Sequence, residues 1–317
     1  MIVLRGHPYE WEVARPTAVT IGVFDGVHLG HRRVIADLVA RSGDLEPAVL
    51  TFDPHPLRVL APDRALKMLT DIDQRLEQFK ILGVRVAGIL DFPDIRELLA
   101  DEFCERVLAG ALAAKRVVIG ADFRFGRDRG GDSTFLSAAG PRLGFEVEVV
   151  DLLDTDDGIV SSTRIRQALL SGQVEEAARM LARPYELKGT VEVGDRRGTQ
   201  IGFPTANLGV DEDRLIPANG VYAAWAMAGG ELQQSVVNIG VRPTFAGSAR
   251  RVEAHLLHWS GDLYGQSLAL RFLSRIRDEK KFEGVDELVA QISSDVEASG
   301  RIFEDAKVGS VPHDSQV

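Results

Sequence analysis

The stretch that decides the fold of the first half is Thr20-Ile21-Gly22-Val23-Phe24-Asp25-Gly26-Val27-His28-Leu29-Gly30-His31. An apolar run of strand character leads into a glycine turn, and the pair His28 and His31 follows at the start of a predicted helix. A strand that feeds a glycine turn and then a helix directs backbone N–H groups at whatever lies at the helix start, which makes an anion site. The stretch therefore predicts a phosphate-binding loop at the carboxyl end of a strand.

The rest of the first half repeats this alternation of short apolar runs and helical patterns. We expect strands at 19–24, 48–52, 84–90, 116–119 and 145–150, and helices at 31–41, 73–82 and 101–111. Strands separated by helices indicate parallel pairing in a layered, Rossmann-like α/β sheet with right-handed crossovers. Ligands of such sheets bind beyond the carboxyl ends of the strands, where the turns after Val23, Phe52 and Ile119 also fall.

The second half follows a different pattern, so the chain is predicted to hold two domains. Two short helices, at 161–172 and 173–181, precede Arg183-Pro184-Tyr185, which stops the helical periodicity. We place the domains at 1–183 and 184–305. The polar residues 306–317 are expected to form a disordered tail.

Short strands joined by turns dominate residues 184–280 and predict an all-β fold, either a small barrel or a sandwich. Segments 221–227 and 232–239 flank Gly229-Gly230 and read as one hairpin, and segments 252–259 and 268–276 flank Ser260-Gly261-Asp262 and read as another. A single amphipathic helix follows, with Leu288, Ile292 and Val296 on one stripe.

Composition excludes several classes of protein. The 317 residues are 45% hydrophobic and carry a formal net charge of −10, which argues against a nucleic-acid partner. The single cysteine, Cys104, excludes an intrachain disulfide and a cysteine-based metal site, and we expect it to be a packing residue. No apolar run approaches the ~20 residues of a membrane span. Because no signal-peptide pattern is seen either, we expect a cytoplasmic protein without a membrane partner.

The first half has the residues that an attack on a nucleotide α-phosphate needs. Gly22 would allow close approach of the nucleotide, and Gly26 and Gly30 would allow the turn. His28 and His31 lie three apart across one helical turn, so both imidazoles can face one phosphate and stabilise charge developing on it. A second helix start, with Ser162, Thr163, Arg164 and Arg166, suits a leaving pyrophosphate through bidentate arginine contacts.

Two other interpretations of the histidine pair are weaker. A zinc site lacks an evident third ligand, and the pair lies in a glycine turn. A dinucleotide-binding oxidoreductase would carry G-x-G-x-x-G after the first strand, whereas this chain has Gly22-Val-Phe-Asp-Gly26.

The second half contains the residues that phosphorylation of an alcohol needs, namely a base, a magnesium ion and donors around the terminal phosphate. The hydroxyl of Thr205 and the side-chain carbonyl of Asn207 are hard oxygen ligands on one side of an extended segment, and Pro204 fixes the backbone before them. Glu253 alternates with Val252 and Ala254 and can point away from the apolar layer. It is our candidate base, and Thr205 and Asn207 are our candidate Mg²⁺ ligands.

The chain resembles the prokaryotic bifunctional riboflavin kinase/FAD synthetase family from about residue 15 to residue 303. The adenylyltransferase module of that family is similar in the runs 22–31 quoted above, Thr51-Phe-Asp-Pro-His-Pro56, Gly120-Ala-Asp-Phe-Arg-Phe-Gly126 and Ser161-Ser-Thr-Arg-Ile-Arg166. The kinase module is similar in Gly194-Asp-Arg-Arg-Gly198, Gly202-Phe-Pro-Thr-Ala-Asn207, Asn238-Ile-Gly-Val-Arg-Pro-Thr-Phe245 and Val252-Glu-Ala-His255.

The resemblance implies a nucleotidyltransferase-type parallel sheet, a riboflavin-kinase-type barrel with a C-terminal helix, and two consecutive reactions. Riboflavin and ATP would give FMN, and FMN and ATP would give FAD and pyrophosphate, with Mg²⁺ as cofactor. The partners would be these small molecules, and a homo-oligomer is compatible with the sequence. Where some family members carry Asn, this chain has Asp122, and Thr199-Gln200 replaces a common arginine after the kinase glycine loop.

By the same resemblance, catalytic roles fall to Glu253, His28 and His31. The adenylyltransferase would bind nucleotide and phosphate through Gly22, Phe24, Asp25, Gly30, Ser162, Thr163, Arg164 and Arg166. Asp122, Phe123, Arg124, Asp53 and His55 are candidates for flavin or nucleotide contact, although for Asp53, His55 and Arg124 an ordinary surface-loop role is about as well supported. The kinase would bind nucleotide through Gly194, Gly198, Gly202, Pro204, Thr205 and Asn207.

Two alternatives stay open at this point. A flavin-binding regulator or carrier on the same scaffold would be expected to have lost part of a site, whereas His28, His31 and the Ser162-Thr163 helix start are all present. A general nucleotidyltransferase with an unrelated β domain would not need the 204–207 run or Glu253.

Overall fold

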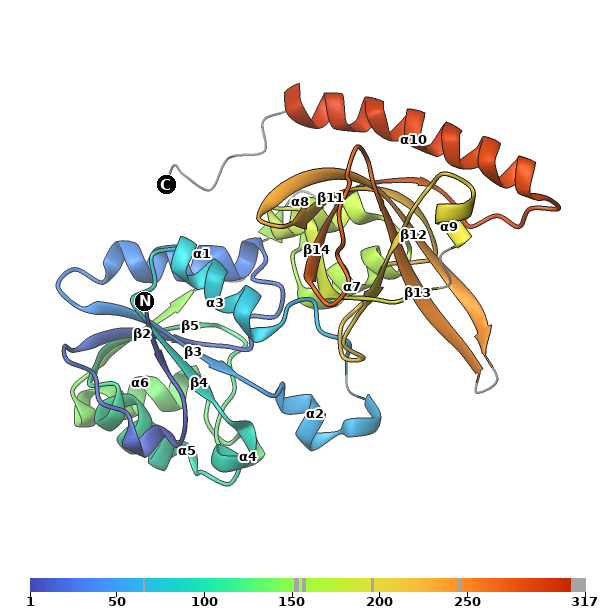
Figure 1. The fold of residues 1–317 in the computed structure, drawn as a ribbon. Coiled ribbons are helices and arrows are strands. Elements are labelled where there is room, and N and C mark those ends of the chain that lie inside the picture. The colour runs from blue at the N-terminus through green and yellow to red at the C-terminus, as the bar shows by residue number, and fades with distance from the viewer. Residues whose placement is uncertain (65, 151–153, 156–157, 195–196, 245–246, 309–317) are drawn as a thin grey trace. The chain divides into compact units, whose positions relative to one another are not determined.

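The computed structural model describes residues 1–64, 66–150, 154–155, 158–194, 197–244 and 247–308 (Figure 1). The chain divides into two compact units, Met1–Ser161 and Ser162–Val317, and each is described by itself. The predicted domain boundary after residue 183 stays a prediction, but both helices just before it belong to the second compact unit.

The described strands of the first unit form a six-stranded parallel sheet in the order β1-β4-β3-β2-β5-β6. They are β1 (Ile2–Leu4), β2 (Thr17–Ile21), β3 (Glu46–Phe52), β4 (Val86–Leu90), β5 (Ala114–Gly120) and β6 (Glu146–Val150). The predicted parallel α/β sheet is therefore confirmed. The three-residue edge strand β1 was not predicted, because so short a run carries no periodic signal.

Helices cover both faces of the sheet, α1 and α3 on one face and α4, α5 and α6 on the other (Figure 1). Their bounds are α1 Leu29–Arg41, α2 Pro56–Leu60, α3 Ile72–Ile81, α4 Phe92–Ile95, α5 Ala100–Glu102 and α6 Ser133–Leu143. Single turns are η1 Pro8–Glu10, η2 Pro62–Arg64 and η4 Arg127–Arg129, and β7 (Asp154–Thr155) pairs with β8 (Gly158–Ile159). The predicted helix 101–111 becomes α5 followed by a π-helical stretch, η3 (Phe103–Ala111).

Because helices cover both faces of the sheet, the side chains on both faces of its central strands are buried. In β3, Val49 packs with Phe79 of α3 on one face, whereas Leu50 packs with Phe103 on the other. Cys104 lies in the latter core, and burial raises its pKa to about 12. The thiol is thus a packing group, as the sequence indicates.

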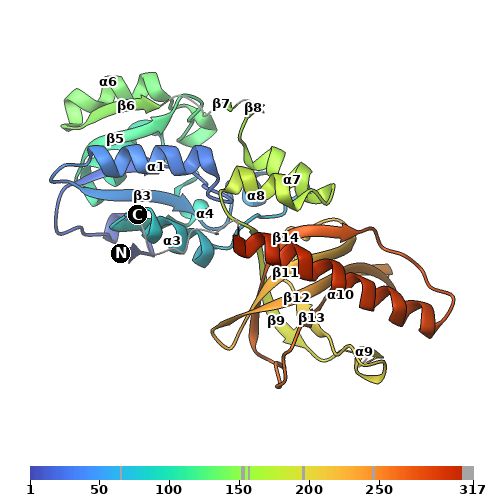
Figure 2. The ribbon, with the colours of Figure 1, turned by 90° about the horizontal axis from the view of Figure 1, so that it is seen from above.

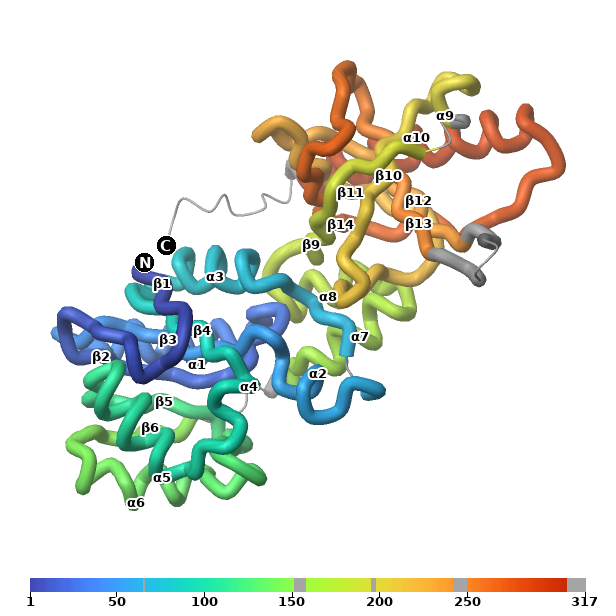
Figure 3. Tube along the Cα trace, turned by 60° about the horizontal axis from the view of Figure 1, so that its bottom comes forward, coloured from blue at the N-terminus to red at the C-terminus, as the bar shows by residue number. Residues whose placement is uncertain are grey.

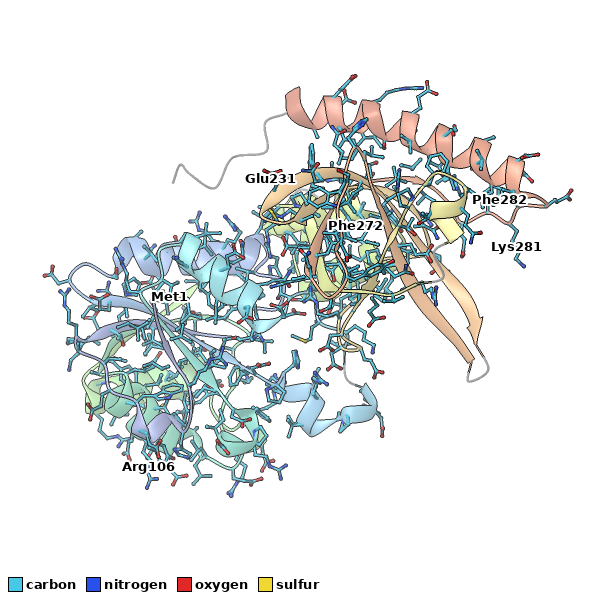
Figure 4. The ribbon with its side chains drawn as sticks, viewed as in Figure 1. Met1, Arg106, Glu231, Phe272, Lys281 and Phe282 are labelled. Atoms are coloured by element: carbon cyan, nitrogen blue, oxygen red, sulfur yellow. The ribbon has the colours of Figure 1, made fainter. Side chains whose placement is uncertain are left out.

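The second unit begins with α7 (Ser162–Leu170) and α8 (Val174–Leu181) and continues into a closed antiparallel barrel. The barrel order is β10-β13-β12-β11-β14-β9. The strands are β9 Tyr185–Glu192, β10 Ala206–Gly209, β11 Gly220–Ala228, β12 Glu231–Thr244, β13 Gly247–Leu256 and β14 Ser267–Arg277, with the single turn α9 (Arg197–Gln200) before β10. Phe272 of β14 is fully buried (Figure 4), and its ring meets the Tyr222 ring edge-on.

One predicted hairpin is confirmed and the other is wrong. Strands β11 and β12 pair directly, with the turn at Gly229-Gly230. Strands β13 and β14 are not neighbours, because β13 pairs with β12 and β10, while β14 pairs with β11 and β9. The turn residues 260–262 therefore begin a crossing of the barrel, and closure of the barrel decides the partners.

The last helix, α10 (Val285–Val308), lies along the outside of the barrel over β11, β12 and β14 (Figures 1 and 2). Phe303 is fully buried there, and its ring lies 4.9 Å from that of Trp225. Residues 306–308 of the predicted tail are helical, and the remainder of that tail lies outside the described residues. Within the described part of the chain, no helix combines the length and apolar character needed to cross a bilayer.

Candidate active sites

The first candidate site lies at the topological switch point of the parallel sheet. From β2 the chain continues through β3 to β4 on one side and then returns to β5 on the other side of β2. Open α/β sheets bind ligands beyond the carboxyl ends of the two strands at such a point. The loop 22–28 follows β2, and the loop 121–126 follows β5. Because β2 and β5 are parallel, the two loops leave the sheet at the same edge (Figure 3).

The two predicted histidines stand together at the start of α1. His28 is the N-cap residue, and its Nδ1 accepts a hydrogen bond of 3.4 Å from the backbone N–H of His31. Their rings stack with centroids 3.6 Å apart and an interplanar angle of 20°. His28 is only 6% exposed. The structure thus brings both imidazoles to one place, the positive end of a helix.

His31 lies in an environment that disfavours its charged form. Burial, and then the neighbouring His28, lower the pKa of His31 well below its ordinary value of 6.5. Its ring edge also meets Phe24, with centroids 5.2 Å apart. Within the described residues, the buried Nδ1 of His31 has no hydrogen-bond partner. A neutral imidazole with an unused ring nitrogen can donate one hydrogen bond to a ligand or accept one from it.

The predicted glycines support the histidine pair in different ways. Gly26 has a φ of +83°, which confirms its turn role. Gly30 is part of the helix, and a Cβ there would lie 3.2 Å from Cε1 of His28, so glycine makes room for that ring. A Cβ at Gly22 would lie 3.0 Å from Cζ of Phe24. Glycine thus makes room for the Phe24 ring, and the close approach of a nucleotide at Gly22 stays a prediction.

Asp25 is buried, 2% exposed, and its carboxylate is used inside the fold. It accepts hydrogen bonds from the backbone N–H groups of Leu69 and Thr70 and from the Thr70 hydroxyl, at 3.0–3.1 Å. The Thr70 oxygen in turn accepts the Gly26 N–H at 2.9 Å. These bonds hold the turn against the segment before α3, so the geometry favours a supporting role for Asp25 over phosphate contact.

The candidates for flavin or nucleotide contact lie on loops at the same edge of the sheet. Asp53 follows β3, and its carboxylate is 3.7 Å from the guanidinium of Arg75. His55 caps α2 by accepting the Leu57 N–H at 3.0 Å. After β5, Asp122 and Arg124 are exposed, while the ring of Phe123 stacks on that of Phe125 with centroids 5.5 Å apart.

The predicted pyrophosphate residues are placed at the start of α7 in the second compact unit. Arg164 forms an ion pair of 3.1 Å with Glu176 of α8. Arg166 is buried, whereas Ser162 is half-buried and Thr163 is exposed. Their predicted convergence with His28 and His31 on one nucleotide stays a prediction.

The second candidate site is a cavity of 440 Å³ in the second unit, between the outer face of the barrel and α10. Its wall includes Thr205, Asn207 and Glu253 on the polar side and Val221, Val236, Leu288 and Ile292 on the apolar side. A concave apolar site with a few convergent polar groups is the usual form of a small-molecule site.

A row of polar side chains crosses three strands at the mouth of this cavity. Asn207 of β10 and Asn238 of β12 both stand directly opposite Glu253 of β13. Residues directly opposite in an antiparallel pair point to the same face. Glu253 is 31% exposed at its side chain, and its neighbours Val252 and Ala254 are buried. The predicted orientation of Glu253, away from the apolar layer, is therefore confirmed.

Gly194 and the segment 198–205 pack closely around this row. A Cβ at Gly194 would collide with the Asn207 amide, at 2.1 Å from Nδ2. A Cβ at Gly198 would lie 2.2 Å from the Phe203 carbonyl oxygen, and Gly202 has a φ of +88°. The Nδ1 of His255 lies 2.7 Å from the Pro204 carbonyl oxygen, which anchors the run that carries Thr205.

Charged groups fix the opposite wall of the cavity. Arg277 of β14 binds both carboxylate oxygens of Asp295 of α10, at 2.7–3.1 Å, and Gln291 adds a bond of 3.0 Å. The Asp295 side chain is 4% exposed. Beside the base candidate, Arg251 lies 3.8 Å from Glu253. The cavity thus combines an anchored helix with a cation close to Glu253.

Some residues of the second site had no role assigned from the sequence, among them Asn238, Arg251, Arg277 and Asp295. Asn238 carries a usable signal, because it is a lone polar residue in the apolar run 236–239. Arg277 and Asp295 carry none, since their pairing joins a strand to a helix and arises only in the folded chain.

Comparisons with known proteins give a family match for each half of the chain. A family model described as FAD synthetase matches residues 11–164, and one described as riboflavin kinase matches residues 181–303. A bifunctional riboflavin kinase/FMN adenylyltransferase of Listeria monocytogenes is 39% identical over 90% of this chain and 92% of its own length. The Bacillus subtilis protein of the same description is 36% identical over 94% of this chain and 96% of its own length.

The chain is also similar to a solved Streptococcus pneumoniae structure described as a macrolide-efflux protein, with a TM-score of 0.86. The two are 33% identical, and the match covers 94% of this chain and 99% of that one. Together, the two matched family models and the full-length relatives decide the assignment. The chain belongs to the family of bifunctional riboflavin kinase/FMN adenylyltransferases.

Proposed function

We propose that the chain phosphorylates riboflavin with ATP to give FMN in its barrel unit, and then transfers AMP from a second ATP to FMN through its parallel-sheet unit. The observation that carries the first step is the row Asn207, Glu253 and Asn238 at a cavity large enough for a small molecule. The stacked His28 and His31 at the switch point support the second step.

In the kinase reaction, Glu253 takes the proton of the primary hydroxyl of riboflavin. The alcohol oxygen then bonds to the terminal phosphorus of ATP, the bond from that phosphorus to the bridging oxygen breaks, and ADP leaves. Arg251, 3.8 Å from Glu253, would stabilise charge on the transferred group. Asn238, directly opposite Glu253 on β12, would orient the hydroxyl.

Magnesium would be held at Thr205 Oγ1 and Asn207 Oδ1, where it would neutralise charge on the ATP phosphates. The donor set fits, because both are hard oxygen ligands on the cavity wall that holds Glu253. The described residues contain no cluster of three or more His, Cys, Asp or Glu that could hold an ion alone. Phosphate oxygens and water would complete the shell, which is the usual form of a nucleotide Mg²⁺ site.

In the adenylyl transfer, a phosphate oxygen of FMN bonds to the α-phosphorus of ATP, the bond from that phosphorus to the bridging oxygen breaks, and pyrophosphate leaves. FMN is already an anion at neutral pH, so no strong base is needed. His28 and His31 would donate hydrogen bonds to the α-phosphate as its charge develops. Ser162, Thr163 and Arg164 would receive the leaving pyrophosphate.

One assay tests both steps. The pure protein is incubated with riboflavin, ATP and magnesium, and FMN and FAD are separated and quantified over time. We expect FMN to appear first and FAD to follow, and we expect excess chelator to stop FMN formation. Thr205→Val should raise the magnesium concentration needed for half-maximal FMN formation. Absence of FMN with FAD formed normally from added FMN would contradict the kinase assignment, and the converse result would contradict the transferase assignment.

The same proposal places the enzyme in the cytoplasm, because both reactions consume ATP.

A further inference from the structure

Arg75 is a fully buried arginine that bonds to the turn after β2, the turn that leads to His28 and His31. It lies on α3 and is 1% exposed. Burying an arginine is costly unless its donors are satisfied, so its contacts show what it holds together.

Those contacts join the ends of two neighbouring strands. Its Nη1 donates to the carbonyl oxygen of Val23 at 3.0 Å, to that of Phe52 at 2.9 Å and to the hydroxyl of Thr51 at 2.9 Å. The Thr51 hydroxyl itself donates to the Val23 carbonyl at 3.0 Å. One guanidinium thus links the turn after β2 to the end of β3.

A second set of bonds fixes the start of α3 to the same turn. Asp25 accepts from Thr70, and Thr70 accepts from Gly26, as described above. The capping box of Asp71 and Gln74 then starts the helix that carries Arg75. The turn is therefore held by two residues of the segment 70–75, at Val23 by Arg75 and at Asp25 and Gly26 by Thr70.

We propose that Arg75 is a positioning residue for adenylyl transfer. It sets both the turn that places His28 and His31 and the loop that begins at Asp53. This inference rests on the proposed function of the first unit. Arg75 acts through the backbone, by its bonds to the carbonyl oxygens of Val23 and Phe52. Asp53, 3.7 Å from its Nη2, is assigned by the same geometry to offset the buried charge.

The expected consequence of removing Arg75 is a lower kcat of FAD formation, with little change in KM or in FMN formation. Displacement of catalytic groups by about 1 Å can cost about 10²-fold in rate. We expect Arg75→Met to lower kcat of FAD formation from FMN and ATP by about 10²-fold, with a smaller change in KM for either substrate. Arg75→Lys retains the charge and some donors and should recover about a tenth of wild-type activity or more. FMN formation from riboflavin in the same preparations should stay within about twofold.

Arg15→Met is the matched control, because it removes an arginine at the opposite, amino end of β3. Arg15 binds the Asp44 carbonyl and the Glu46 carboxylate, both at 3.1 Å. That variant should keep wild-type FAD formation. Thr51→Val tests the same link without removing a charge and should show a smaller loss than Arg75→Met.

The experiment measures steady-state FAD and FMN formation together with thermal unfolding for all four variants. FAD formation within about threefold of wild type in Arg75→Met and Thr51→Val would overturn the proposal. Equal losses in Arg75→Met and Arg75→Lys that track a lowered unfolding temperature would also overturn it, in favour of a purely structural role. Should Arg75→Met fail to fold, the kcat values of Arg75→Lys and Thr51→Val for FAD formation decide whether the proposed positioning role holds. Absence of FAD formation in the wild type would instead reject the proposed function itself.

Discussion

His28 and His31 stack with ring centroids 3.6 Å apart, and the Nδ1 of His28 accepts the backbone N–H of His31. Because that Nδ1 is an acceptor, the proton of a neutral His28 ring is on Nε2. The cap therefore fixes the tautomer of His28 and leaves Nε2–H as the donor for a ligand. We propose that the two stacked rings act together on the same phosphate.

His28→Ala or His31→Ala should lower FAD formation from FMN and ATP. Removing a donor that acts as charge develops typically costs about 10²–10³ in turnover. The double variant should lose less than the product of the two single losses, because the rings act on one group. The measurement is steady-state FAD formation beside FMN formation from riboflavin, which should be unchanged. Normal FAD formation in either single variant would reject the direct role of that histidine.

The lowered pKa of His31 predicts that the folded state loses stability as the pH falls. Unfolded His31 binds a proton below about 6.5, whereas the folded form stays neutral there, so the unfolded state binds more protons. The stabilisation is fully present above that pH and declines below it, by at most about 1.4 kcal/mol per pH unit.

Urea unfolding between pH 5 and pH 7.5 measures this effect. His31→Asn should flatten the pH dependence of the unfolding free energy, while the control His258→Asn, at an exposed histidine, should keep the wild-type slope. Identical slopes for wild type and His31→Asn would show that His31 titrates normally in the folded chain.

Glu253→Gln should remove the base of the kinase reaction and keep the side-chain shape. Loss of general-base assistance typically costs about 10²–10⁴ in rate. FMN formation should fall by that order, while FAD formation from supplied FMN should stay near normal. His258→Asn again provides a control on the same unit. Equal losses in both activities would indicate that Glu253 supports folding instead.

The barrel unit should make FMN by itself, and helices α7 and α8 should contribute to its stability. Glu175 of α8 accepts hydrogen bonds from the Ser274 hydroxyl and from the Arg275 N–H of β14, and Leu169 of α7 accepts the Ala218 N–H at 2.9 Å. A fragment 162–317 should fold and form FMN but no FAD.

A shorter fragment, 182–317, tests how much the two helices matter. It should still form FMN but unfold at least about 2 kcal/mol more easily, because it loses fully buried side chains such as Val174. Chemical unfolding of both fragments checks the difference. Equal stability would show that the helices belong energetically to the first unit, as the predicted boundary after residue 183 has it.

The sequence alone determined the two fold classes and named most of the candidate site residues, because both depend on local patterns. Alternation of apolar runs and helical periods indicated the parallel sheet, and the 22–31 stretch placed His28 and His31 at a helix start. The strand alternation around Glu253 predicted its orientation, since the side-chain period of a strand is fixed by its backbone.

Only the tertiary structure decided which distant residues meet. Barrel closure gave β14 the partners β11 and β9, and it placed Asn207 and Asn238 on either side of Glu253. The burial of Arg75 against the turn after β2 had no local signal at all, because a single arginine in an amphipathic helix is expected at the surface. Local pattern fixes the direction in which a side chain points, but long-range packing selects its partners.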